Sequence, residues 1–151
     1  MAMISIRNPP PLPEDLERYI DKPYGGLFGD SAICKLVEEI VADPHAEYRL
    51  ADLEELIDGS QRSIARALKV LSTLGLLIKD ESDRLHPLYR VNLNSRKLLA
   101  LTFLAYAVVD DRDGTNCMDL AIRDYYNSVA EEAPKSIASE VPASRAEGET
   151  S

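Results

Sequence analysis

The sequence predicts a mainly α-helical fold with one small β-hairpin and further helices after the hairpin. Three observations support this fold class. Apolar residues recur at helical spacing between residues 30 and 74, two strand-like segments flank a polar turn at 81–84, and residues 97–109 are apolar almost throughout. We therefore expect a helical core, then a hairpin, then a helical C-terminal region.

Length and composition exclude several classes of protein. The chain has 151 residues, of which 45% are hydrophobic and 28% charged, with a formal net charge of -9. These values are ordinary for one globular domain and too hydrophobic for a wholly disordered chain. No apolar run approaches the roughly 18 to 20 residues that span a bilayer, and the N-terminus lacks the apolar segment of a signal peptide. We expect a soluble cytoplasmic protein with no membrane partner.

The two ends of the chain differ in composition from its centre. Residues 1–28 contain five prolines and two glycines, which predicts an extended arm with at most a short helix over 13–21. The last 20 residues are small and acidic without apolar periodicity, which predicts a disordered tail. The expected organisation is an arm at 1–28, a helical and hairpin domain at 29–95, C-terminal helices at 96–131 and an acidic tail at 132–151.

Two helices are expected first in the central domain. The first begins at Asp30, is stopped by Pro44, and has apolar residues at i, i+3, i+4, i+7 and i+8: Ile33, Leu36, Val37, Ile40 and Val41. A short extended stretch over 47–49 follows. A second helix of about two turns is then predicted from Leu50, Leu53, Leu56 and Ile57, and it is ended by Asp58 and Gly59.

A third helix, capped by Ser60 and spanning 60–74, separates into two faces at 100° per residue. The apolar face holds Ile64, Ala67, Leu68 and Leu71. The opposite face is basic and contains no acidic residue, and its members are Arg62, Arg66, Lys69 and Thr73. An ordinary solvated helix would mix both signs of charge. On the helix pattern alone, this basic face is either a solvated surface or a surface that binds an anionic partner, and its position in the fold decides between the two.

The hairpin and the C-terminal helices come next. Gly75 ends the third helix, and strands are expected at 76–80 and 85–92, the second on a sheet edge because it contains Pro87. Residues 97–109 predict a helix that must be covered by protein, and 110–116 predict an Asp-rich turn. Residues 117–130 then predict an amphipathic helix carried by Met118, Ala121, Ile122, Tyr125 and Val129.

No motif indicates a metal site, a cofactor or catalysis. Cys34 and Cys117 are far apart and have neither CxxC spacing nor a neighbouring histidine pair. The DDRDGTN segment would place Val109 and Leu120 at the first and twelfth positions of a calcium loop, which excludes calcium there. Neither a Ser-His-acid arrangement nor a glycine-rich phosphate loop is present. We expect a protein that is not an enzyme and needs no metal and no cofactor.

The stretch YRLADLEELIDGSQRSIARALKVLSTLGLLIKD at 48–80 resembles the DNA-binding core of MarR-like and ArsR-like transcriptional regulators. The resemblance covers about 60 residues, from Asp30 to Asn92, and implies a winged helix-turn-helix fold. It departs from the usual pattern in having Asp58-Gly59 directly before the capping serine, and an acidic loop at 80–83.

The resemblance implies that residues 60–74 form the recognition helix and residues 76–92 the wing. In such proteins the start of the recognition helix meets base edges in the major groove of double-stranded DNA. The expected DNA-binding residues are Ser60, Gln61, Arg62, Ser63, Arg66, Lys69, Arg84 and His86. For the two wing residues, an ordinary hairpin surface is an equally good interpretation.

The distribution of charge supports local binding of phosphate. Residues 59–97 carry a net charge of +5, whereas residues 1–58 carry -8 and residues 98–151 carry -6. A basic island in an acidic chain is what local neutralisation of DNA requires. The acidic remainder also fits a halophilic cytoplasm.

These observations predict a sequence-specific, double-stranded DNA-binding transcriptional regulator that acts as a homodimer. The alternative is a winged-helix module for protein assembly without sequence-specific DNA binding. We expect the surplus apolar surface of the C-terminal helices to meet a second copy through Leu98, Leu101, Leu104, Tyr106, Val108, Ile122 and Tyr125. The alternative for these helices is that they cover each other and the core of a monomer. The sequence does not identify a small-molecule effector.

Overall fold

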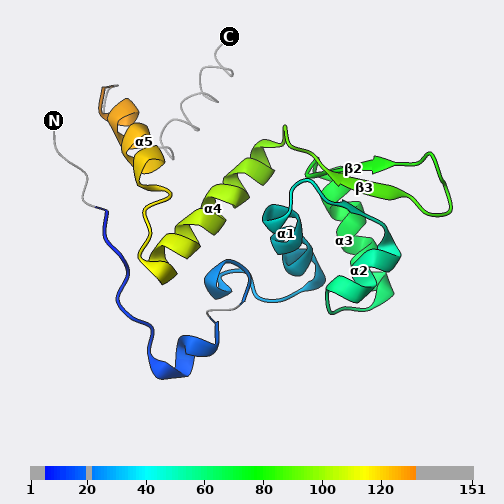
Figure 1. The fold of residues 1–151 in the computed structure, drawn as a ribbon, viewed down its shortest axis with the longest axis horizontal. Coiled ribbons are helices and arrows are strands. Elements are labelled where there is room, and N and C mark those ends of the chain that lie inside the picture. The colour runs from blue at the N-terminus through cyan, green and yellow to red at the C-terminus, as the bar shows by residue number, and fades with distance from the viewer. Residues whose placement is uncertain (1–5, 20–21, 132–151) are drawn as a thin grey trace, which may run out of the picture. The chain divides into compact units, whose positions relative to one another are not determined.

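The computed structural model describes residues 6–19 and 22–131 (Figure 1). It is mainly helical with a small three-stranded antiparallel sheet. The chain forms two compact units, one over Pro9–Thr115 and one that includes residues 6–8 and 116–131. The elements are η1 (Glu14–Tyr19), η2 (Pro23–Gly26), α1 (Ala32–Ala42), β1 (Glu47–Tyr48), α2 (Leu50–Leu56), α3 (Gln61–Thr73), β2 (Leu77–Asp80), β3 (Leu88–Val91), α4 (Arg96–Asp113) and α5 (Asp119–Glu131).

The first two α-helices lie where the apolar spacing predicts them. Ser31 caps α1 by accepting the backbone N–H of Cys34, and Leu36 and Ile40 on its inner face are fully buried. In α2, Leu53 is buried, but Leu56 is 54% exposed. The helix ends at Leu56 and the backbone of Ile57 is extended, so Ile57 takes the core position beside α2 instead.

The sheet differs from the predicted hairpin in two respects. β1 pairs with β3, and the strand order β1-β3-β2 makes β3 the central strand. The edge position expected for the second hairpin strand is therefore wrong. Pro87 precedes the strand rather than lying within it, because a central strand needs its backbone N–H groups for the ladder and β3 begins only at Leu88.

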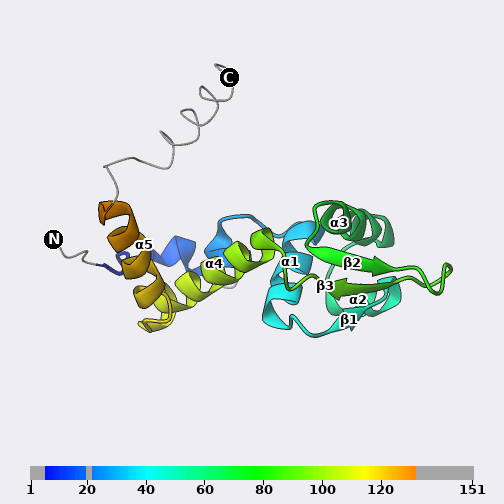
Figure 2. The ribbon, with the colours of Figure 1, turned by 90° about the horizontal axis from the view of Figure 1, so that it is seen from above.

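One hydrophobic core lies between the helices and the sheet of the Pro9–Thr115 unit (Figure 2). It contains Ile64, Ala67, Leu68 and Leu71 of α3, as the two-face interpretation predicts. The expected extended arm to residue 28 is wrong in its last part. Tyr24 in η2 is buried in this core, and η2 contacts both α1 and α4. Burial of a large aromatic ring favours this docked conformation over an extended one.

The C-terminal helices are placed as expected but have different bounds. α4 continues through Asp110–Asp113, which the sequence analysis assigned to a turn, and it ends at Gly114 in the left-handed conformation with φ of 71°. α5 belongs to the second unit. The predicted disordered tail at 132–151 lies outside the described residues. Among residues 6–19 and 22–131, no helix combines the length and apolarity that crossing a membrane requires.

Candidate nucleic-acid interface

The start of α3 is held by two serines. The backbone N–H of Ser63 donates to Oγ of Ser60 at 3.1 Å, and Oγ of Ser63 donates to the backbone carbonyl of Ser60 at 2.9 Å. Both hydroxyls, which the sequence analysis assigned to DNA contact, are thus used in building the first turn. Their interactions fix where α3 begins and therefore which residues its outer face presents.

The outer face of α3 presents three cations, Arg62, Arg66 and Lys69, which we call the basic stripe. All three side chains are exposed, and none has a hydrogen-bond or ion-pair partner within the described part of the chain. The opposite face is buried in the core. Gln61 is also exposed beside the stripe, at the first helical position. The stripe is therefore free to bind an anionic ligand while packing holds the helix in place.

The turn between α2 and α3 explains the unusual Asp58-Gly59 pair. A Cβ atom at Gly59 would lie 3.1 Å from Oγ of Ser63 and 3.6 Å from Cβ of Ala32, so the turn passes close to both α3 and α1. Nζ of Lys35 in α1 donates to the carbonyl of Asp58 at 3.3 Å. This close approach and a φ of 157°, which L side chains rarely adopt, both favour glycine at this position, and the buried Ile57 supplies the apolar anchor.

Two acidic residues, Asp80 and Asp83, form the hydrogen bonds that shape the β2–β3 loop. Asp80 accepts hydrogen bonds from the backbone N–H (2.9 Å) and the hydroxyl (2.6 Å) of Ser82. These bonds lower the pKa of the Asp80 carboxyl. Asp83 accepts from the backbone N–H groups of Leu85 (3.2 Å) and His86 (3.4 Å). Such Asx turns are a structural reason for carboxylates at positions where a phosphate contact would favour cations.

Arg84 and His86 lie exposed in this loop, apart from α3 in sequence. Their side chains make no hydrogen bond or ion pair with another described residue. The loop extends away from the helices in both views (Figures 1 and 2). The basic stripe thus lies on one face of α3, whereas Arg84 and His86 lie on a separate loop.

Two polar residues that the sequence analysis did not single out fix the end of α3. Nδ2 of Asn92 donates to the carbonyl of Gly75 at 2.8 Å, and Nζ of Lys97 donates to the carbonyl of Leu74 at 3.5 Å. Both satisfy carbonyls at a helix C-terminus. No sequence pattern signals these bonds, because the donors lie 17 and 23 residues from their acceptors.

Four of the residues expected to dimerise are used inside the Pro9–Thr115 unit. Leu98 is buried in the core, and Leu101, Leu104 and Val108 pack against the core. Tyr106 is exposed on α4. On α5, Ile122 is half-buried and Tyr125 is exposed. Leu99 and Phe103 are also exposed on α4, and neither was among the residues expected to dimerise. They were missed because a helix that is apolar on all sides gives no signal of which face is buried.

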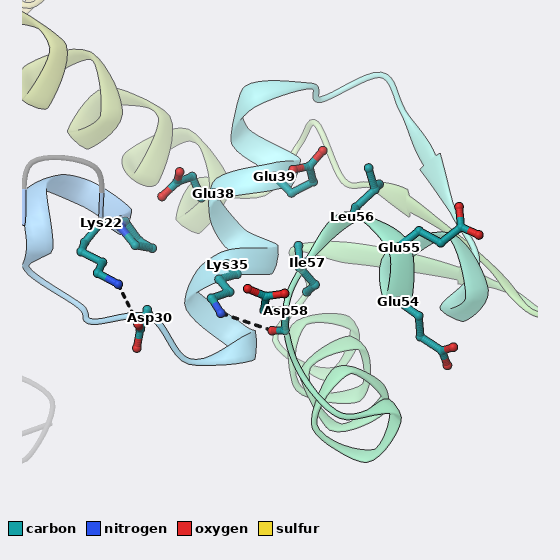
Figure 3. Close-up of a pocket in the computed structure, with 11 residues that line it drawn as sticks. Lys22, Asp30, Lys35, Glu38, Glu39, Glu54, Glu55, Leu56, Ile57 and Asp58 are labelled. Atoms are coloured by element: carbon teal, nitrogen blue, oxygen red, sulfur yellow. Dashed lines mark hydrogen bonds and ion pairs between the residues drawn. The ribbon is translucent and has the colours of Figure 1, made fainter.

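A cavity of about 360 Å³ lies near the start of α1 and the end of α2 (Figure 3). Six acidic residues line it: Asp30, Glu38, Glu39, Glu54, Glu55 and Asp58. Its lysines already have partners, because Lys22 pairs with Asp30 at 2.9 Å and Lys35 binds the carbonyl of Asp58. Desolvation, and then the charge of Glu39, raise the pKa of the Glu38 carboxyl.

The chemistry of this cavity is opposite to that of the basic stripe. An anion would meet a surplus of carboxylates there. Across residues 6–19 and 22–131, no three His, Cys, Asp or Glu side chains are gathered closely enough to hold a metal ion. The basic stripe is consequently the better candidate for a functional surface.

Comparison of the chain with protein-family models, with characterised proteins and with solved structures gave no match.

Proposed function

We propose that the protein is a winged helix-turn-helix transcriptional regulator that binds double-stranded DNA sequence-specifically as a homodimer. The observation that carries this proposal is the basic stripe: three exposed cations that have no partner among the described residues, on a helix whose opposite face is buried in the core. The order of helices and strands from α1 to β3 supports it, because it is the order that the sequence resemblance implies.

In this proposal α3 lies in the major groove. Arg62 and Arg66 are near its N-terminal end, where side chains of a recognition helix reach base edges, and an arginine binds guanine bidentately. Lys69 is farther along and binds phosphate. Gln61 is placed to contact a base or the backbone beside them. Ser60 and Ser63 act by positioning the helix, because their hydroxyls are engaged with each other and with the backbone.

The charge distribution favours DNA over a protein partner for this face. The net charge of +5 over residues 59–97 lies between two acidic regions. A module for protein assembly has no need of three cations in line, whereas release of counterions from DNA phosphates requires them. The acidic remainder of the chain, including the lining of the cavity in Figure 3, repels DNA and limits binding to the α3 side.

The test is binding to duplexes selected by the wild-type chain from a random pool. The Arg62→Ala, Arg66→Ala double variant is compared with Arg123→Ala, which removes an exposed cation from α5. We expect each stripe arginine to be worth about 1 to 3 kcal/mol, roughly 5- to 150-fold in affinity. Lys69→Ala weakens binding to all sequences about equally. Selection of no duplex, or wild-type affinity in the double variant, would show that α3 is not the recognition helix.

A further inference from the structure

α4 has a second apolar face that the core of its own unit leaves exposed. Leu99, Phe103 and Tyr106 are 52%, 41% and 48% exposed, and we call them the α4 stripe. They lie at i, i+4 and i+7, so they share one side of the helix. The side chains that pack on the core, among them Leu98, Leu101 and Ala105, occupy the opposite side. A helix apolar on two sides buries only one of them within this unit.

The α4 stripe continues to both ends of the helix with charged residues. Arg96 lies three residues before Leu99, and Asp110 and Asp113 lie four and seven residues after Tyr106. The whole line has alternating steps of three and four, which is the spacing of a helix-pairing seam. Arg96 and Asp113 are exposed, whereas Asp110 is buried and accepts the hydroxyl of Thr115 at 2.6 Å.

The order of these charges is unfavourable for an isolated helix. Cations stabilise a helix at its C-terminus and anions at its N-terminus. In α4 the first turn holds Arg96 and Lys97 with no acidic residue. The last turn holds Asp111 and Asp113 together with one cation, Arg112, which pairs with Asp113 at 2.9 Å. The line of residues from Arg96 to Asp113, which we call the seam, thus begins with a cation and ends with anions, and α4 of a second copy has the reverse order when it runs antiparallel.

We infer that two copies of the chain pair through antiparallel α4 helices along the α4 stripe. The seam is symmetric about the point midway between Phe103 and Tyr106. A two-fold axis there sets Phe103 against Tyr106 of the partner subunit and Arg96 against Asp113 of the partner subunit. Parallel pairing would instead bring like charges together at both ends. The same axis sets Leu99 against Asp110 of the partner subunit, so the self-complementarity that an isologous interface requires lies at the centre and at the two ends of the seam.

This inference deepens the proposed function, since it rests on the proposed homodimer and assigns its surface. The first test is light scattering on the full chain without DNA. We expect wild type at about twice 16.7 kDa and Phe103→Asp at the monomer mass with unchanged circular dichroism. The matched control is Leu85→Asp, because Leu85 is 85% exposed in the β2–β3 loop, and this variant should stay dimeric.

Other outcomes would overturn the inference. A dimeric Phe103→Asp variant would place the interface elsewhere. The wild-type chain could instead be monomeric and lose stability on the Phe103→Asp substitution. That result would show that another part of the same chain covers the α4 stripe. Because these measurements contain no DNA, they are independent of whether α3 binds it. If the chain is a monomer and its DNA binding depends on Arg62, pairing through α4 is contradicted but the assignment of DNA binding to α3 is unaffected.

The second test examines the antiparallel geometry by reversing charges. In the antiparallel dimer, residue 96 of each subunit faces residue 113 of the other, so there are two such contacts. Arg96→Glu or Asp113→Arg alone makes both contacts repulsive, and each should raise the dimer dissociation constant by about tenfold. The double variant Arg96→Glu, Asp113→Arg restores opposite charges at both ends and should dimerise as wild type. Single variants without effect, or a double variant as weak as the singles, would contradict antiparallel pairing.

Discussion

Two tyrosines deep in the core have hydroxyl groups that find no hydrogen-bond partner among the described residues. Tyr24 and Tyr48 are both buried, and burial is the main cause that raises the pKa of each phenol to about 12. Nearby carboxylates add to the effect, from Glu38 for Tyr24 and from Glu39 for Tyr48. Both phenols are thus held neutral by the fold, because ionisation would leave a buried charge without compensation.

An alkaline titration should detect these two residues. The folded pKa lies above the unfolded value of about 10, so the stabilising effect is complete below pH 10 and is lost as the pH rises towards 12. We expect tyrosinate absorbance to contain a component near pH 12 that shrinks in both Tyr24→Phe and Tyr48→Phe, and the unfolding midpoint to fall over the same range. A folded chain in which neither variant changes that component would contradict this description of the core.

At the scale of single elements, Ser60 supplies the N-terminal cap of α3. Ser60→Ala removes the acceptor for the N–H of Ser63 and should cost about 1 kcal/mol in the free energy of unfolding. The control is Ser72→Ala, because Ser72 donates only to the carbonyl of Leu68 within the helix and alanine is a good helix former. Denaturant titration should show a loss for the first variant and almost none for the second. Equal losses would mean that Ser60 is not the cap.

The carboxylates of the β2–β3 loop have different roles: Asp80 and Asp83 shape the loop, and Glu81 does not. Asp80 and Asp83 accept hydrogen bonds from backbone N–H groups, whereas Glu81 forms an ion pair with Lys79 at 3.1 Å. Glu81→Gln should leave the loop intact, release Lys79 and raise DNA affinity by about two- to fivefold. Asp80→Asn keeps an acceptor and serves as the loop control. A Glu81→Gln chain with unchanged or lower affinity in gel shifts would place the loop away from the phosphates.

For the whole molecule, the proposed binding mode makes salt a quantitative probe. Three stripe cations and up to two loop residues per copy replace condensed counterions, so log affinity should fall with log salt with a slope of about -3 to -5 per protomer. Between 50 and 200 mM salt this corresponds to roughly 50- to 1,000-fold per protomer. Filter binding of a selected duplex at four or more salt concentrations gives the slope. A slope near zero would contradict phosphate binding by α3.

The parts of the fold that follow from local patterns could be predicted from the sequence. Ser60, Gly75 and the spacing of Ile64, Leu68 and Leu71 determine where α3 begins, where it ends and which face is buried, and all of these signals lie within the helix itself. The exposure of the basic stripe follows from the same pattern.

Features that depend on distant residues could not be predicted in this way. The central position of β3 results from pairing with β1. The sequence predicts β1 as a short extended stretch but gives no signal of the strand with which it pairs. Tyr24 lies in a proline-rich and glycine-rich stretch that is typical of an extended arm, and only its contacts with α1 and α4 bring it into the core. The inward face of α4 is hidden because apolar residues surround the helix.

The docking of η2 against α4 has a consequence for the order of folding. A Cβ atom at Gly25 would lie 3.7 Å from Val108, so this contact joins segments near the two ends of the Pro9–Thr115 unit. Closing so long a loop costs more entropy than closing the turns between α1 and β3. The central helices and sheet should therefore form first, and η2 and α4 should close onto them last. Contacts formed after the rate-limiting step mainly slow unfolding, so this closure gives the folded chain a longer lifetime without making it fold faster.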